Sequence, residues 1–449
     1  MITVLLLPAA FAATLQWEDV RRNTLAHMPQ LLAAEAKIEG ARARLRASEG
    51  AFDYTLAGRA RGQQVDADAN RFWEAKLTRP TTLWGAELFA GRRQGNGTYA
   101  TFEGKSATSA VGEVFAGLEV PLLRDRTMDR PRLELGLATL DVRRRGLERD
   151  QRTLDVLLKT GAAYWKWVRA GHRLHINREW VEAADKRQGW LARRVQAGDT
   201  GKIKLVDAQR ALAQGQANLA EAKREFALAQ SELLLLSPGS PVDMGALPLE
   251  VPIMARLAPG EADQDRLPQF GILSVERQAL EQKRDYARAL ALPDLRLGME
   301  AARDLAGPPP GRSDDDQLRL AVRLEVPFEN RRAQGACQEV SADLAALHHE
   351  RVWLGSAWKT RVAQNEAAWI GVGEQLAWQR QELADTERLR EAEIRRLEQG
   401  DSDIFFVILR EFDLVKVRLA LLETTTLKAL TALEAAALSG RLLNPKEMP

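Results

Sequence analysis

Residues 28–45 read MPQLLAAEAKIEGARARL, and residues 267–280 read LPQFGILSVERQAL. Both segments start with an apolar residue followed by Pro-Gln, and they lie roughly 240 residues apart. A sequence that resembles itself at a large offset predicts two copies of one architecture in tandem.

Three further pairs of segments support this duplication, because they occur in the same order in both halves. They are LEVPLLR at 118–124 with LEVPF at 324–328, AYW at 163–165 with AAW at 367–369, and QAGDTG at 196–201 with EQGDSD at 398–403. We therefore divide the chain into a first repeat (13–236), a linker rich in Pro and Gly (237–267), a second repeat (268–440) and a short tail (441–449).

The composition excludes several classes of function. The chain has 449 residues, 45% of them apolar and 28% charged, with a formal net charge of +2. Because the two signs of charge are interspersed, binding of nucleic acid driven by net charge is not expected. A single cysteine, Cys337, excludes CxxC sites and an intrachain disulfide, and five histidines offer little for metal or nucleophilic chemistry. We predict no catalytic, cofactor or metal site.

The first residues, MITVLLLPAAFAA, predict export of the chain. The apolar run ends at Ala10-Phe11-Ala12, which is typical of a signal-peptide cleavage site, so residues 1–12 are predicted to be a signal peptide. A buried N-terminal strand is the alternative. No later window approaches the ~18 apolar residues that a membrane-spanning helix needs, which excludes a helical inner-membrane protein.

Each repeat contains one very long helix followed by a turn and a second helix. From Asp129 to Gln196 apolar residues step by 4 and 3, a heptad pattern that predicts a coiled coil. Gly198 and Gly400 mark the turns. After them the predicted seams are Leu205, Ala208, Leu212, Gly215, Leu219, Ala222, Phe226, Ala229, Leu233 and Leu236, and then Phe405, Ile408, Phe412, Val415, Leu419, Leu422, Thr426, Ala429, Leu433 and Ala436.

Four amphipathic strands are predicted, at 52–61, 112–120, 294–302 and 317–326. In the last of these, Leu318, Leu320, Val322 and Leu324 share one face, whereas Arg319 and Arg323 share the other. This alternation is typical of a membrane β-barrel, although a soluble sheet has the same period. Four strands cannot close a barrel, so copies must pool them: two copies give eight strands and a lumen filled by side chains, whereas three give twelve and leave room for a channel. A hairpin at 72–78 and 83–91 either joins the barrel or lies outside it.

The repeated MPQLLAAEAKIEGARARL and LPQFGILSVERQAL segments, the LEVPLLR and LEVPF strand ends, the AYW and AAW aromatics and the turn glycines resemble the TolC family of outer-membrane efflux proteins. The resemblance implies a mainly α fold with β structure: a homotrimer with a twelve-stranded transmembrane β-barrel in outer-membrane lipid, continued by an α-helical coiled-coil barrel in the periplasm. It also implies a periplasmic adaptor and an inner-membrane transporter as partners, and no cofactor. We expect a passive duct for small molecules, with type I protein secretion as the alternative. A periplasmic adaptor or structural coiled coil is the alternative from another class.

The resemblance assigns the helical turns to docking of the adaptor, through Gly198, Thr200, Gly201, Gly400 and Ser402. The turns also carry Asp199, Asp401 and Asp403, which are candidate acids around a narrow aperture. Alternatively, Asp199 and Asp401 cap the helices that follow them. The family often has an Asp six residues after the turn glycine. Here Lys204 and Phe406 stand at those positions, so its gating contacts do not carry over.

Overall fold

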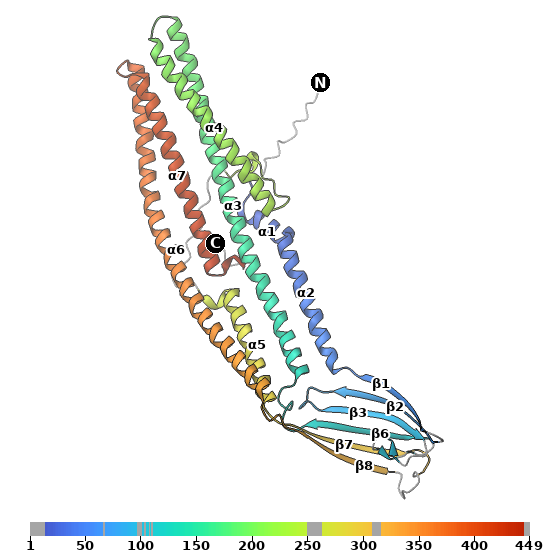
Figure 1. Cartoon of the computed structure of the whole chain (residues 1–449). Coiled ribbons are helices and arrows are strands. Elements are labelled where there is room, and N and C mark those ends of the chain that lie inside the picture. The colour runs from blue at the N-terminus through green and yellow to red at the C-terminus, as the bar shows by residue number, and fades with distance from the viewer. Residues whose placement is uncertain are drawn as a thin grey trace, which may run out of the picture. The chain divides into compact units, whose positions relative to one another are not determined.

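The computed structural model describes residues 14–65, 68–96, 101–102, 105–106, 108, 111–248, 263–307 and 316–443. Helices account for most of these residues (Figure 1). The α-helices are α1 (Trp17–His27), α2 (Pro29–Glu49), α3 (Arg130–Gln196), α4 (Lys202–Leu236), α5 (Pro268–Leu290), α6 (Arg331–Gln399) and α7 (Ile404–Leu438). Within the described ranges, no helix is both long enough and apolar enough to cross a membrane.

The strands form one large antiparallel sheet and one small ribbon. The six-stranded sheet has the order β1-β2-β3-β6-β7-β8, and β4 pairs with β5 alone. The strands are β1 (Thr55–Val65), β2 (Asp68–Pro80), β3 (Glu87–Asn96), β4 (Thr101–Phe102), β5 (Lys105–Ser106), β6 (Glu113–Pro121), β7 (Asp294–Asp304) and β8 (Asp316–Glu325). Because β6 pairs with β7, both halves of the sequence contribute to one sheet.

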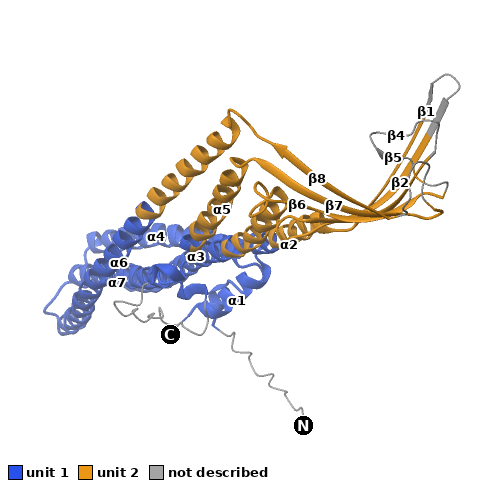
Figure 2. Cartoon of the chain, turned by 90° about the horizontal axis from the view of Figure 1, so that it is seen from below, with its two compact units in different colours: residues 1–35, 148–270, 353–449 blue, residues 36–147, 271–352 orange. Residues whose placement is uncertain are grey.

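The chain divides into two compact units, and each unit draws on both halves of the sequence (Figure 2). Unit 1 comprises residues 1–35, 148–270 and 353–449, and unit 2 comprises residues 36–147 and 271–352. The whole sheet belongs to unit 2. The physical units therefore cut across the two predicted repeats, because backbone hydrogen bonds join strands from both halves.

Unit 1 is built around an aromatic core on α3. Tyr164, Trp165 and Trp167 are almost completely buried, and the Tyr164 hydroxyl donates a hydrogen bond to the Leu15 carbonyl at 3.0 Å. Gly161 lets α7 approach closely, since a Cβ there would lie 2.5 Å from a methyl carbon of Leu433. Burial raises the pKa of the Tyr164 hydroxyl, which therefore stays protonated.

The predicted seams match the structure on α4 and on only the second half of α7. The buried residues of α4 all belong to its predicted seam, and they are Ala208, Gly215, Ala222, Phe226, Ala229 and Leu233. On α7, Leu422, Thr426, Ala429, Leu433 and Ala436 are buried as predicted. The start of the α7 prediction is wrong. Phe405 and Phe412 are exposed there, and Val407 and Leu414 are buried instead.

The sheet has six strands: the four predicted amphipathic strands are present as β1, β6, β7 and β8, and the predicted hairpin supplies β2 and β3. β2 and β3, the hairpin whose place was left open, lie between β1 and β6 and pair with both. The first strand also begins later than expected, at Thr55, since residues Gly50–Phe52 form a 3₁₀ turn.

The linker and tail are partly packed on unit 1. Met244 and Leu247 pack against its core as expected from their apolar side chains, and Leu442 of the tail is fully buried. The apolar linker residues Leu249, Val251, Ile253 and Met254 lie outside the described residues. The predicted signal peptide, residues 1–12, also lies outside them.

Candidate functional site

The two helical turns of unit 1 share one backbone geometry. Gly198 and Gly400 have φ of +80° and +82°, the left-handed region in which glycine carries no Cβ penalty. After α3 the Asp199 amide donates to the Arg194 carbonyl at 2.9 Å, and after α6 the Asp401 amide donates to the Arg396 carbonyl at 2.9 Å. Both helices therefore end in a Schellman motif, as the turn glycines predict.

The helices that leave the turns are capped differently from the prediction. The N-cap of α4 is Gly201, which offers no side chain, and the N-cap of α7 is Asp403, whose carboxylate accepts from the Phe405 amide at 2.9 Å. Asp199 and Asp401 are exposed, and their amides complete the preceding helices. The alternative in which Asp199 and Asp401 act as caps is therefore wrong, because each lies two residues too early.

A salt bridge between Lys204 on α4 and Asp403 joins the two turns. The hydrogen bond from Lys204, with that from the Phe405 amide, holds the pKa of the Asp403 carboxyl below its usual range. Asp403 is thus engaged on both oxygens, unlike Asp199 and Asp401. From the sequence, Lys204 was recognised only as a departure from the family pattern. Its salt bridge could not be predicted, because the sequence of one helix does not reveal which residue of another turn it will contact.

A small apolar cluster lies beneath the turns, and apolar side chains surround it on the surface. Leu191, Ala208, Ile404 and Val407 are buried together, so all of α3, α4 and α7 contribute to this end of unit 1. Exposed apolar residues near the same turns are Ile203, Val206, Phe405, Phe406 and Leu409. Of the other predicted turn residues, Ser402 donates a hydrogen bond to Glu393, and Thr200 is half-buried.

One face of the six-stranded sheet is apolar and exposed. On β8, Leu318, Leu320, Val322 and Leu324 are 62% to 70% exposed and share that face. The register aligns Leu318 with Ala301, Ala116, Ala90, Leu77 and Leu56 across the other five strands. A face of this composition needs an apolar environment to cover it.

The opposite face of the sheet is charged and tightly paired. Arg93 on β3 is 2% exposed, forms a salt bridge with Glu113 on β6, and lies 2.6 Å from Glu300 on β7. Arg319 on β8 reaches Glu300 at 2.6 Å and Glu113 at 3.3 Å. The sequence pattern did not single out Arg93 or Glu113. For Glu113 and Glu300 the available signal was the apolar neighbours Val114 and Met299, whereas Arg93 lies between Arg92 and Gln94 and carries no such signal.

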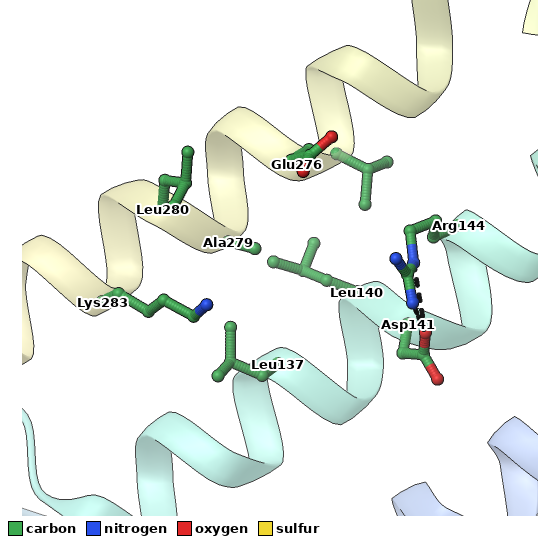
Figure 3. Close-up of a pocket in the computed structure, with 9 residues that line it drawn as sticks. Leu137, Leu140, Asp141, Arg144, Glu276, Ala279, Leu280 and Lys283 are labelled. Carbon is green, nitrogen blue, oxygen red and sulfur yellow. Dashed lines mark hydrogen bonds and ion pairs between the residues drawn. The ribbon is translucent and has the colours of Figure 1, made fainter. Parts of the chain in front are cut away.

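A groove of about 250 Å³ lies between α3 and α5 in unit 2 (Figure 3). Leu137, Leu140 and Leu280 line it, and Asp141 pairs with Arg144 at 2.7 Å beside them. The pairing of Asp141 with Arg144 neutralises two of the charged groups that line the groove. Among the described residues no cluster of three or more His, Cys, Asp or Glu side chains could hold a metal ion.

The fold is shared with solved structures of bacterial outer-membrane channels. The chain matches CusC, described as forming a transmembrane channel, at a TM-score of 0.68 and 15% identity over 95% of this chain and 93% of that one. It matches the MtrE outer membrane channel of Neisseria gonorrhoeae (TM-score 0.67, 14% identity, 94% and 88%). It also matches the CmeC outer membrane channel of Campylobacter jejuni (0.66, 14%, 94% and 85%).

At this level of identity the likeness establishes the fold, and the resemblance to the TolC family is confirmed in that sense. No family model matches the sequence, and no curated protein matches it.

Proposed function

We propose that this chain is the outer-membrane exit duct of a tripartite efflux system. In this proposal three copies assemble, their sheets close into a barrel in outer-membrane lipid, and their helices form a tunnel in the periplasm. The observation that carries the proposal is the sheet: six strands with one exposed apolar face and one charged, paired face. That division suits a barrel with lipid outside and water inside.

Unpaired edges and exposed aromatic residues support assembly of copies. β1 and β8 end the sheet of one chain, and open strand edges are not tolerated in lipid. On α6, Trp353 and Trp378 are 71% and 76% exposed. Side chains of that size are covered in an assembly, because large exposed apolar surfaces mark interfaces.

The partners in this proposal are a periplasmic adaptor, which docks on the turns at Gly198, Thr200, Gly201, Gly400 and Ser402, and an inner-membrane transporter. The exposed apolar residues Ile203, Val206, Phe405 and Phe406 near those turns support docking at that end of unit 1. The transporter supplies the energy and delivers small molecules, so the duct itself is passive and is not an enzyme. Similar structures are channel proteins, which supports this role.

Cell fractionation with an oligomer assay tests the proposal. We expect the full chain in the outer-membrane fraction as an oligomer that runs faster or slower on a gel before heating than after it. We also expect deletion of the gene to sensitise the cells to at least one toxic small molecule. Recovery of the chain as a soluble periplasmic protein would contradict the channel proposal and favour an adaptor or structural coiled coil.

A further inference from the structure

The hairpin of β2 and β3 is a full part of the large sheet. β2 pairs with β1 from Thr55↔Thr78 to Val65↔Asp68, and with β3 from Arg71↔Asn96 to Pro80↔Glu87. β3 then pairs with β6 from Glu87↔Glu119 to Arg93↔Glu113. In this sheet β1 is connected to β6 only through the hairpin, so the hairpin is not an appendage.

The hairpin also has one apolar face and one polar face, and these coincide with the two faces of the rest of the sheet. Leu77 on β2 and Leu88 on β3 lie on the apolar face and are 41% and 48% exposed. One residue along β2, Lys76 and Thr78 belong to the opposite face. Since register fixes which side every residue faces, the hairpin continues the exposed apolar face of β8 with leucines of its own.

Ion pairs on the charged face link β3 of the hairpin to β6 and β7. Arg93 pairs with both Glu113 and Glu300, as Arg319 on β8 also does. Without β3 these two carboxylates would share one cation among the described residues, Arg319, and an uncompensated buried charge is strongly destabilising. Phe89 on β3 and Phe115 on β6 also pack into the space opposite Gly117 and Gly91, where a Cβ would approach each ring to 2.6 Å.

From these observations we infer that each chain contributes six membrane strands and that three copies close an eighteen-stranded barrel. The inference rests on the proposed function, since it needs a barrel in lipid. Six is an even number, so β8 of one copy runs antiparallel to β1 of the next and the edges can pair. Barrel diameter grows roughly linearly with strand number, so this barrel is about 1.5 times as wide as one of twelve strands.

The width has a consequence for cargo. Barrels of 16 to 18 strands enclose an aqueous channel, whereas small ones are filled by side chains. The membrane section of the duct therefore does not select small solutes by size, and selection falls to the helical section or the partners.

Arginine substitutions on the apolar face of the sheet test the six membrane strands. Leu77 on the hairpin and Leu318 on β8 lie in the same cross-strand row and belong to that face. We expect Leu77→Arg and Leu318→Arg each to lower the recovered outer-membrane oligomer about tenfold or more, since arginine on the lipid face is costly. Thr78→Arg, the neighbour on the opposite face, is the matched control and should leave recovery within about twofold.

The outcomes separate the two proposals. If Leu318→Arg blocks insertion and Leu77→Arg does not, the hairpin lies outside the bilayer and the six-strand inference is overturned while the channel proposal stands. If neither variant matters, the channel proposal itself is overturned. Electron cryomicroscopy of the purified full-length oligomer then counts strands: we expect three-fold symmetry and eighteen strands, and twelve strands with either two-fold or three-fold symmetry would contradict the inference.

Discussion

At the scale of single residues, the left-handed glycines of the two turns make the sharpest prediction. Gly400 has φ of +82° and open space around its Cα, so strain and not crowding limits substitution. We expect Gly400→Val to cost about 1–2 kcal/mol locally, because a β-branched residue disfavours this conformation. Efflux, measured as resistance to a toxic substrate, should fall while the oligomer stays in the membrane.

The control for Gly400 is Gly371→Val. Gly371 is an exposed glycine within α6 that also has open space around it, but its backbone is helical. We expect near-normal efflux from this variant. Equal activity of the two variants would argue that the turn does not take part in docking.

Asp403 combines a cap with a salt bridge, and two substitutions separate these roles. Asp403→Asn keeps a good N-cap and loses the charge that pairs with Lys204, so we expect a loss of a few tenths of a kcal/mol for this half-exposed pair. Asp403→Ala loses the cap as well and should cost about 1 kcal/mol more. Thermal unfolding of the purified oligomer measures both differences.

The lowered pKa of Asp403 gives this contribution a pH dependence. A carboxyl whose pKa is lower in the folded state stabilises the protein above its unfolded pKa, near 4, and loses that contribution as the pH falls through the folded pKa. The difference between wild type and Asp403→Asn should therefore be constant at neutral pH and shrink below about pH 4. A difference that grows on acidification would show that Asp403 is not held by Lys204.

At the scale of elements, the approach of α7 to α3 depends on Gly161. Leu433, the residue that a Cβ at Gly161 would meet, is 1% exposed and has little room to move. We expect Gly161→Ala to destabilise unit 1 by about 1–3 kcal/mol through overpacking. Gly146→Ala, also on α3 but with open space around it, should be neutral or stabilising by up to about 1 kcal/mol. A lower melting temperature for both variants would exclude a packing cause.

The two faces of β8 give a second prediction at this scale. Leu320→Arg, on the apolar face, should cost about 2–4 kcal/mol if it reaches the bilayer midplane. Ala321→Arg places the same side chain one residue along, on the charged face, and should insert normally. Arg319→Leu is a poor control because it would strip Glu300 of a partner at 2.6 Å. Failure of Ala321→Arg with success of Leu320→Arg would invert our assignment of the faces.

At the scale of the whole molecule, the exposed acids of the turns predict the ion preference of the assembled duct. Asp199 and Asp401 are exposed, whereas Asp403 is neutralised by Lys204. If the turns of three copies surround an aperture, the exposed carboxylates focus a negative potential there and favour cations. Asp199→Asn with Asp401→Asn should therefore lower the cation-to-anion permeability ratio in planar bilayers, and Asp403→Asn should change it less. An unchanged ratio in the double variant would remove these acids from the aperture.

The sequence by itself determined the features that depend on local periodicity. The heptad pattern predicted α3 almost to the residue, and glycine at 198 and 400 predicted turns that only a residue without a Cβ adopts freely. Strand alternation predicted which side chains of β8 share a face. Each of these follows from neighbours within one element, where the spacing of side chains is fixed by backbone geometry.

Only the tertiary structure decided the features that depend on partners far along the chain. The start of α7, IFFVIL, is apolar all round, so no period could select Val407 over Phe405 as the buried side. On the charged face of the sheet, Arg93 pairs with Glu113 and Glu300. Between the two turns, Lys204 pairs with Asp403. Such pairings form between elements brought together by folding, and a linear pattern carries no information on which distant charge will meet which.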